Sequence, residues 1–262
     1  MRKFTILKTM PAQNLRHTPR EQPYLRQAIF HPERTPDFSR HPFNIPAVRD
    51  IARIDFHPGI TFFTGENGSG KSTILEAIAI ALGHNPEGGS KHARFQTADT
   101  GDNLHAHLRL IRSPPVPKDG YFLRAESLFN VITHRQHIGY AHDYDGRALH
   151  GNSHGEAFLS VLLHRLSGNG LYLLDEPEAA LSPARQMVAL RAFHHLVQHH
   201  SQLIIATHSP ILLAYPHARI YHFDENGIHP ITYENSDPYR STRDFLNHYH
   251  ERLRQLLTDD DT

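Results

Sequence analysis

The sequence feature that most constrains the fold is a glycine-rich stretch between two apolar runs. It fits the pattern G-x-x-x-x-G-K-[ST], whose backbone N–H groups surround the phosphates of a nucleotide. Its glycines let the chain turn tightly and place no Cβ between the N–H groups and the phosphate oxygens. We therefore predict a phosphate site formed by Gly65, Glu66, Asn67, Gly68, Ser69, Gly70, Lys71, Ser72 and Thr73.

Three residues of this loop carry most of its chemistry. Lys71 adds a full positive charge near the β- and γ-phosphates, so we predict a catalytic role for it. The hydroxyl of Ser72 is a hard oxygen ligand of the kind that Mg²⁺ prefers. Gly70 opens the following helix, whose N-terminus directs partial positive charge at the same anion.

The flanking sequence has the strand, loop and helix that this motif requires. Residues 60–64 are mostly β-branched or aromatic and predict a buried strand. Residues 74–82 are too apolar for an exposed helix, and Gly83 is suited to the position just after a helix end. This context favours a nucleotide site over a glycine-rich turn without a ligand.

Composition excludes several other classes of site. Lysine plus arginine equals aspartate plus glutamate at 27 each, so no overall field draws the chain to nucleic acid or anionic lipid. The absence of cysteine excludes disulfides and thiolate chemistry. No apolar run approaches the length of a membrane span, so we expect a cytoplasmic protein without membrane insertion. The 24 histidines are scattered, and we expect them to be structural or solvated rather than metal ligands.

The first part of the chain predicts an extended arm. Residues 1–46 hold seven of the 18 prolines, at spacings that oppose helices. We therefore divide the chain into an arm, 1–40, and a single domain, 41–262. The aromatic ring of Phe43 is a candidate for stacking on adenine, with simple packing as the alternative.

Alternating strands and helices predict the rest of the fold. We expect strands at 104–111, 121–125, 171–174 and 203–207, and a hairpin whose type I′ turn is Asn226-Gly227. A helix should follow Ser182 and bury Met187, Leu190, Phe193 and Val197, and a last helix should begin at Ser241. This order predicts an α/β fold with a mainly parallel, helix-flanked sheet and an antiparallel portion.

Three polar residues follow two of these apolar strands. Because parallel strands end at one edge of a sheet, Asp175, Glu176 and His208 should lie beside the phosphate loop. Asp175 is the expected anchor for Mg²⁺, and Glu176 can polarise an attacking water. His208 can donate to the γ-phosphate. Glu178, by contrast, is expected to be a residue of a turn or of the surface.

The segment 152–156 allows two interpretations. Ser153 and Glu156 fit a capping box at the start of an apolar helix. A capped helix N-terminus with serine and Gly155 is also an anion site, which could receive the γ-phosphate of a nucleotide held by another subunit.

These motifs give residues 58–213 a resemblance to ABC-type P-loop ATPases, closest to the soluble RecF, SMC and overcoming-lysogenization-defect branch and to compact stand-alone ATPases of bacteria. Gly65–Ser72 matches the Walker A motif, Leu171–Glu176 matches Walker B, and Thr207–Pro210 matches the switch-histidine motif. Asn152–Glu156 stands at the signature motif and keeps Ser153 and Gly155, although His154 replaces a glycine.

Other positions depart from the family pattern. Ser182 stands where the family has the D-loop aspartate. No glutamine is obvious at the Q-loop, where Glu126 is our first candidate, as a metal ligand beside Ser72 and Asp175, and Gln96 is the second.

The resemblance implies MgATP hydrolysis by a head-to-tail homodimer, with Ser153 and Gly155 contacting the partner's nucleotide. One alternative is the nucleotide-binding subunit of an ABC transporter. Another is a nucleotide-gated module for DNA or a nuclease partner, for which the basic residues of the N-terminal region offer a modest footprint.

Overall fold

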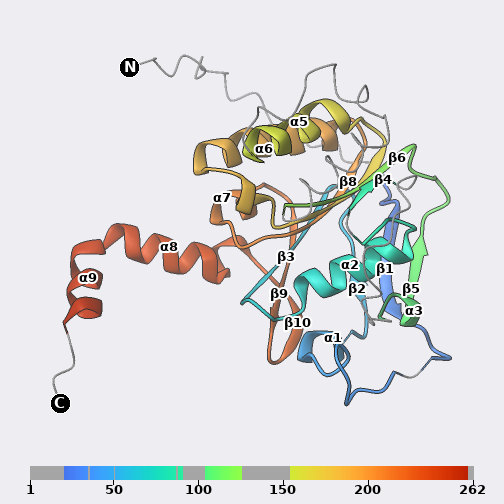
Figure 1. The fold of residues 1–262 in the computed structure, drawn as a ribbon, viewed down its shortest axis with the longest axis horizontal. Helices are drawn as coiled ribbons and strands as arrows, with labels where there is room; N and C mark the ends of the chain where they lie inside the picture. The colour runs from blue at the N-terminus through green and yellow to red at the C-terminus, as the bar shows by residue number, and fades with distance from the viewer. Residues whose placement is uncertain are drawn as a thin grey trace.

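The computed structural model describes residues 21–34, 36–49, 51–86, 88–90, 104–125 and 154–258. A seven-stranded sheet forms the centre of this part of the chain, in the order β10-β9-β3-β8-β7-β6-β4 (Figure 1). The inner strands run parallel, and the edge strands β10 and β4 are antiparallel to their neighbours. Their bounds are β3 Ile60–Gly65, β4 Gly89–Ser90, β6 Asp119–Arg124, β7 Gly170–Asp175, β8 Gln202–Ala206, β9 Arg219–Asp224 and β10 Gly227–Ile231.

A smaller antiparallel sheet lies beside the large one. It has the order β2-β1-β5, with β1 at Leu25–Phe30, β2 at Ile54–Asp55 and β5 at Leu108–Arg112. The fold is therefore of the α/β P-loop NTPase type, with a mixed, mostly parallel sheet and a small antiparallel sheet, as the sequence predicted.

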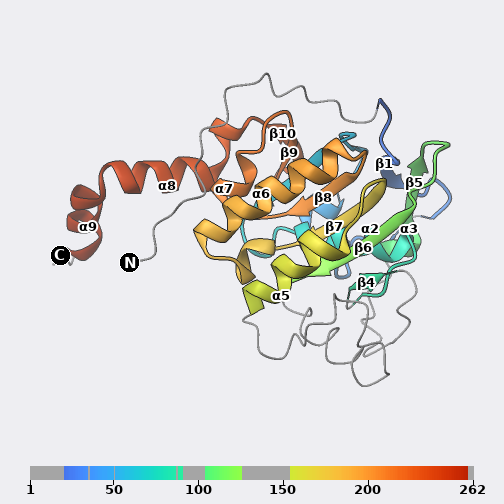
Figure 2. The same cartoon turned by 90° about the horizontal axis from the view of Figure 1, so that it is seen from above.

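Helices cover both faces of the large sheet (Figures 1 and 2). Helix α2 packs on one face with the small sheet, and α5 and α6 pack on the other. No helix among the described residues is both long and apolar enough to cross a membrane. The α-helices are α1 Pro46–Arg49, α2 Lys71–Ala81, α3 Leu104–His107, α5 His154–Ser160, α6 Pro183–Gln198, α7 Pro210–Leu213, α8 Asp237–Asn247 and α9 Tyr249–Leu257, and shorter 3₁₀ or π turns span Val161–Arg165, Pro177–Ala180 and Tyr233–Asn235.

The inner strands alternate between two cores. On β8, Leu203 and Ile205 face the core under α5 and α6, whereas Ile204 and Ala206 face the core under α2. This two-residue period is the pleat of a strand buried on both faces. It fixes the register of the sheet, because a slip of one residue would exchange the two sets of side chains.

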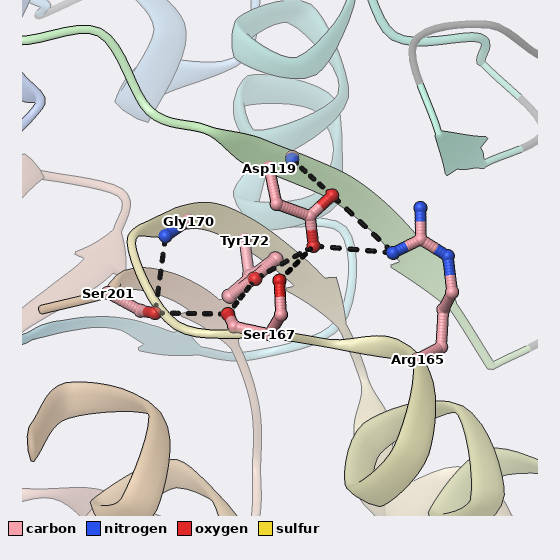
Figure 3. Close-up of polar contacts among 7 residues, drawn as sticks. Asp119, Arg165, Ser167, Gly170, Tyr172 and Ser201 are labelled. Atoms are coloured by element: carbon pink, nitrogen blue, oxygen red, sulfur yellow. Dashed lines mark hydrogen bonds and ion pairs between the residues drawn. The ribbon is translucent and has the colours of Figure 1, made fainter. Parts of the chain in front are cut away.

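A polar cluster secures the start of β7 (Figure 3). The hydroxyl of Tyr172 donates to Asp119 over 2.9 Å, and Arg165 contacts the same carboxylate at 3.3 Å. The hydroxyl of Ser201 accepts from the N–H of Gly170 over 3.3 Å. Burial raises the pKa of the Tyr172 hydroxyl, with Asp119 as the second cause. This cluster lies at the end of β7 opposite to Asp175.

The expected N-terminal arm contains a strand. β1 pairs with both β2 and β5, and Leu25 and Ala28 are fully buried in the core under α2. Prolines oppose helices but allow strands between them, which explains this difference. Residues 1–20 lie outside the described part, and the division of the chain at residue 40 stays a prediction.

Several local expectations were wrong. Residues 104–107 form α3, and only 108–112 are a strand. Met187 is 58% exposed, because α6 buries the neighbouring Gln186 instead. Asp224 pairs with Gly227, so the hairpin loop is Glu225-Asn226 and is not a type I′ turn at Asn226-Gly227.

The C-terminal helix also begins earlier than expected. α8 starts at Asp237 behind Ser236, and α9 follows it after a break at His248. Both helices extend away from the body of the molecule (Figures 1 and 2). Their large apolar side chains Phe245, Leu246, Tyr249, Leu253, Leu256 and Leu257 are exposed.

Candidate functional site

The carboxyl ends of four parallel strands meet at one edge of the large sheet. Gly65 ends β3, Arg124 ends β6, Asp175 ends β7, and His208 follows the end of β8. Lys71, Ser72, Asp175, Glu176 and His208, which the sequence placed in one site, therefore come from neighbouring elements at that edge.

The glycines of the phosphate loop hold conformations that other residues rarely adopt. Gly65, Gly68 and Gly70 have φ of 141°, 79° and 99°. A Cβ at Gly65 would lie 2.1 Å from the carbonyl oxygen of Phe223 on β9, so the loop begins in close contact with the neighbouring strand. Of the other loop residues, Glu66, Asn67 and Gly68 are exposed, and Ser69 and Thr73 are half-buried.

Lys71 lies inside this loop. Its side chain is buried, with only 3% of the residue exposed, and its ammonium donates to the carbonyl oxygens of Gly65 and Glu66 over 3.0 and 2.8 Å. Burial lowers the pKa of Lys71, against the opposing effect of Glu176 and Asp175. Two hydrogen bonds hold the ammonium in place, and the nearby carboxylates do not fully compensate for the unfavourable burial of its charge. An anionic ligand could supply that compensation.

Ser72 joins the loop to β7. Its hydroxyl donates to Oδ1 of Asp175 over 2.8 Å, although the two residues are 103 positions apart. A hydroxyl and a carboxylate side by side form a hard oxygen pair that fits Mg²⁺. These residues are therefore suited to hold the ion that the motif implies.

Arg124 is a member of the site that the sequence analysis missed. It is in register with Asp175 on the adjacent strand, and its Nε lies 3.5 Å from Oδ2 of that carboxylate. It also forms an ion pair of 2.6 Å with Glu76 on α2. Arg124 thus supplies a counter-charge for Asp175. The apolar residues before it predicted the strand but not the register that brings Arg124 and Asp175 together.

Glu176 has a strained backbone. Its φ and ψ are 47° and 53°, in the left-handed region that a residue other than glycine rarely adopts. Its N–H donates to the carbonyl oxygen of Ala206 over 3.0 Å, which holds the turn after β7 against the end of β8. Strain of this kind is typical of functional sites, where the surrounding structure fixes one side-chain position.

His208 faces Glu176. Its Nε2 lies 3.6 Å from Oε1 of Glu176 and makes no hydrogen bond within the described structure. Burial lowers the pKa of His208, and the charge of Lys71 lowers it further. The neutral imidazole is therefore favoured at neutral pH, with one ring nitrogen free for a ligand.

Glu178 lies in a turn, which was one of the two expectations for it, but it is not at the surface. It lies half-buried in the 3₁₀ turn after β7, and its carboxylate accepts a short hydrogen bond from the N–H of His208. Burial raises its pKa, and the bond from His208 opposes that rise. The sequence around Glu178, a turn with proline and a second glutamate, gave no sign that the side chain of Glu178 points inward.

A buried hydrogen-bond network supports the residues around His208. The N–H of Ser209 donates to the hydroxyl of Thr207 over 3.0 Å. The hydroxyl of Ser209 donates to the side chain of Gln186 on α6 over 2.6 Å, and Gln186 donates to the carbonyl oxygen of Leu181 over 3.0 Å. The turn after β8 is therefore tied to α6 and to the turn after β7.

Other predicted residues lie elsewhere. Gly155 is buried at the start of α5, where a Cβ would lie 2.5 Å from the carbonyl oxygen of Ala180, so close packing alone explains this glycine. Phe43 is buried with its ring 4.9 Å from that of His107, which favours packing over adenine stacking. Ser153, Glu126 and Gln96 fall outside the described residues, so their roles stay predictions.

A cavity of ≈ 540 Å³ opens beside the phosphate loop. The loop residues Glu66, Asn67, Gly68 and Ser69 form one wall, and the turn between β9 and β10 forms another. It is large enough for part of a nucleotide next to the phosphate site.

Two family comparisons match different parts of the chain. The family described as "AAA domain" matches residues 43–115, which contain the phosphate loop. The family described as "AAA domain, putative AbiEii toxin, Type IV TA system" matches residues 157–214, which contain Asp175, Glu176 and His208. No curated protein matches the chain with significance.

Solved structures give more distant likenesses. The SMC head domain from Thermotoga maritima is 15% identical with a TM-score of 0.44, over 79% of this chain and 98% of that one. The SMC head bound to the C-winged helix domain of ScpA is 15% identical with a TM-score of 0.42, over 68% and 92%. An inward-facing "putative metal-chelate type ABC transporter" is 17% identical with a TM-score of 0.42, over 71% and 76%. No conclusion about function rests on these likenesses.

The phosphate loop, the parallel sheet and the two AAA-domain matches together define a P-loop ATPase domain. Both matches span residues that the geometry brings to one edge of the sheet.

Proposed function

We propose that this chain hydrolyses MgATP to ADP and phosphate at the edge formed by β3, β7 and β8. The observation that carries the proposal is the 2.8 Å hydrogen bond from Ser72 to Asp175, which joins the phosphate loop to the acidic strand end. Ser72 and Asp175 would hold Mg²⁺, which supplies positive charge to the β- and γ-phosphate oxygens. Lys71 would bind the same oxygens, since its ammonium already lies inside the loop.

Glu176 and His208 would act on the attacking water. Glu176 would accept a proton from the water while the oxygen of the water bonds to the γ-phosphorus. At the same time the bond from that phosphorus to the β,γ-bridging oxygen would break, and ADP would leave. The free Nε2 of His208 would hold the γ-phosphate or the water in line with that attack. The 3.6 Å between the two side chains leaves them facing one small volume.

The proposal includes a head-to-tail homodimer in the ATP state. Ser153 of one subunit would contact the γ-phosphate bound by the other, and Gly155 would let the start of α5 pack closely on Ala180. α5 begins at His154, directly after Ser153, which supports a helix N-terminus at that position. ATP would then favour the closed dimer, because its γ-phosphate touches both subunits and hydrolysis removes that contact.

Replacing Glu176 by Gln tests this reaction. The Glu176→Gln variant should bind MgATP, lose about 100-fold or more of kcat, and elute as a dimer in size-exclusion chromatography with saturating MgATP. Lys71→Ala should lose nucleotide affinity, whereas the exposed control Glu234→Gln should match the wild type. Unchanged hydrolysis by Glu176→Gln contradicts its role, and a monomer under saturating MgATP contradicts the dimer.

A DNA or nuclease partner is the second part of the proposal. It is supported by the charge of residues 1–55, which carry ten basic and five acidic side chains. A partner gated by the dimer should change the rate of ATP hydrolysis. We expect duplex DNA to raise that rate in a salt-sensitive manner, and an ATPase that is indifferent to DNA at low salt would remove the nucleic-acid part.

A further inference from the structure

Two histidines and an aspartate gather on the β9–β10 hairpin. One side-chain ligand atom from each of His222, Asp224 and His229 lies within 4.8 Å of the others. Nε2 of His229 is 3.6 Å from Oδ2 of Asp224, and Nε2 of His222 is 3.9 Å from the same oxygen. These residues lie at the end of β9, beside the phosphate loop, and nothing in the proposed reaction uses them.

The register of the hairpin explains why they meet. His229 of β10 is the direct partner of His222 of β9, with ring centroids 5.4 Å apart. Asp224 lies two residues further along β9, and side chains two apart on a strand share a face. A short antiparallel hairpin therefore presents three metal-ligand groups from a rigid backbone.

A fourth group comes from the start of α8. Oδ2 of Asp237 lies 3.6 Å from Nε2 of His222. Ligands about 2.0–2.2 Å from a tetrahedral zinc ion are roughly 3.3–3.6 Å from one another. The histidine–aspartate separations of 3.6–3.9 Å are close to that range. Asp237 is near His222 but is not one of the three residues whose ligand atoms all lie within 4.8 Å of one another, so its carboxylate would have to turn toward Asp224 and His229 to join them.

Ion pairs between histidine and aspartate are the simpler explanation, but the contacts of 3.6–3.9 Å are too long for the hydrogen bonds that strengthen such pairs. The side chain of His222 is 14% exposed, its Nε2 stays beyond 3.5 Å from both carboxylates, and its buried Nδ1 has no hydrogen-bond partner in the described structure. The imidazole and the two carboxylates therefore face one another without a hydrogen bond, at separations that a shared cation would bridge.

We propose that His222, Asp224 and His229 bind a divalent transition metal, with Asp237 as a fourth ligand. Imidazole with carboxylate in a four-ligand set suits Zn²⁺, whereas Mg²⁺ takes oxygen ligands alone. This inference goes against the sequence expectation that the histidines are structural. It is also independent of the proposed magnesium site at Ser72.

The proposed metal would connect the β9–β10 hairpin, which belongs to the large sheet, with α8, which projects from the body of the molecule. It would tie the first residue of α8, which leads into the projecting helices, to the hairpin beside the phosphate loop. His222, Asp224 and Asp237 also line the cavity next to that loop. The ion would therefore make one wall of the cavity more rigid. It would also hold the start of α8 against the hairpin.

Zinc binding by the full chain, produced without a histidine tag and stripped with a chelator, tests the proposal. Competition with a chromophoric chelator in excess Mg²⁺ and without nucleotide should reveal one tight Zn²⁺ equivalent. Loss of a hydrogen-bond partner of a metal ligand already weakens metal binding by about 10–100-fold, so His229→Ala, which removes a ligand, should weaken it by about 100-fold or more. Asp237→Asn should cost about 10-fold.

The matched control is His195→Ala. His195 and His199 also place their rings close together, with centroids 4.1 Å apart, but they are exposed at the C-terminal end of α6. This variant should keep the tight site. Co²⁺ should give the intense visible absorption of tetrahedral coordination with wild type and lose it with His229→Ala.

Two variants separate failure of this proposal from other causes. His222→Asn retains a polar side chain at the half-buried position and should also lose tight Zn²⁺, with the fold checked by circular dichroism. Lys71→Ala should lose nucleotide but keep Zn²⁺. The site is overturned if the wild type has no tight zinc affinity, or if both His229→Ala and His222→Asn keep that affinity unchanged. Unchanged affinity in Asp237→Asn overturns the role of Asp237 as the fourth ligand.

Discussion

The carboxylate of Glu178 holds the backbone N–H of His208 by a short hydrogen bond across the ends of β7 and β8. The bond fixes where the chain turns after β8, and hence where the His208 ring can lie. Its cost is a buried carboxylate: Oε2 of Glu178 has no hydrogen-bond partner in the described structure. The side chain that positions the backbone of His208 is thus buried where its charged form is disfavoured.

Glu178→Gln should stabilise the protein at neutral pH. Burial raises the folded-state pKa of Glu178 above the usual 4.5, so the folded state binds a proton more tightly than the unfolded state. The associated stability is present below the unfolded pKa and lost as pH rises through the folded pKa. Because glutamine is neutral and can still accept from His208, the variant should melt about 2 °C or more higher at pH 7.5.

The pH dependence of that gain is the decisive measurement. Thermal unfolding of both proteins from pH 8 to pH 5 should show the gain shrinking as pH falls. A gain of constant size would mean that the ionisation of Glu178 is not its cause, and a loss at pH 7.5 would contradict the prediction.

His208→Asn should make the fold less sensitive to acid. Burial and the charge of Lys71 lower the folded-state pKa of His208, so the unfolded state binds the proton more tightly. Stability therefore falls as pH drops through the unfolded value of about 6.5. Asparagine does not titrate, so the fall in the urea midpoint between pH 7.5 and pH 5.5 should be smaller in the variant. The other histidines are common to both proteins, and an equal fall would rule out His208 as a source.

The elements that the sequence predicted best are those with an unambiguous local pattern. The strands β3, β7 and β8 are continuous apolar runs, and each is followed by the polar residue that the site needs. Because parallel strands end at one edge, that pattern was enough to bring Asp175 and His208 beside the loop, whose own motif had placed Lys71. The expectation required no knowledge of loop conformation.

What the sequence did not predict depends on register and on tertiary contacts. Arg124 joins the site only because β6 pairs with β7 so that Arg124 lies opposite Asp175. The prediction of a type I′ turn at Asn226-Gly227 was wrong because only Gly227 has a positive φ, whereas that turn needs one at both residues. The start of α8 was missed because the signal Ser236-Asp237-Pro238, with proline in the first turn, precedes the apolar residues of the helix.

Gly65→Ala should damage the fold far more than Gly68→Ala. A Cβ at Gly65 would lie 2.1 Å from the carbonyl oxygen of Phe223, a backbone atom that cannot move without disturbing the pairing of β3 with β9. Gly68 has no atom within 4 Å of such a Cβ, so alanine there meets only the cost of its positive φ, about 1–2 kcal/mol. We expect Gly65→Ala to cost about 4 kcal/mol or more. Urea unfolding without nucleotide measures both, and similar losses would contradict the close approach of the two strands.

Tyr172→Phe should weaken the fold without changing the chemistry. The Tyr172 hydroxyl donates to Asp119 and also contacts the carbonyl oxygen of Ser167, in the cluster at the start of β7. Phenylalanine keeps the buried ring but leaves Asp119 with Arg165 as its main partner, at a cost of about 1–3 kcal/mol. Because Asp175 lies at the other end of β7, kcat for ATP should stay within about twofold at a temperature where both proteins are folded.

A second tyrosine provides the matched control for that experiment. Tyr249 lies on the projecting α9 and is exposed, so Tyr249→Phe should change the free energy of unfolding by less than about 0.5 kcal/mol. Urea unfolding of the two variants and the wild type measures the difference. If Tyr172→Phe were as stable as Tyr249→Phe, the cluster around Asp119 would not secure β7. If Tyr172→Phe lost ATPase activity while still folded, the start of β7 would be coupled to the position of Asp175. The two ends of β7 would then not act independently.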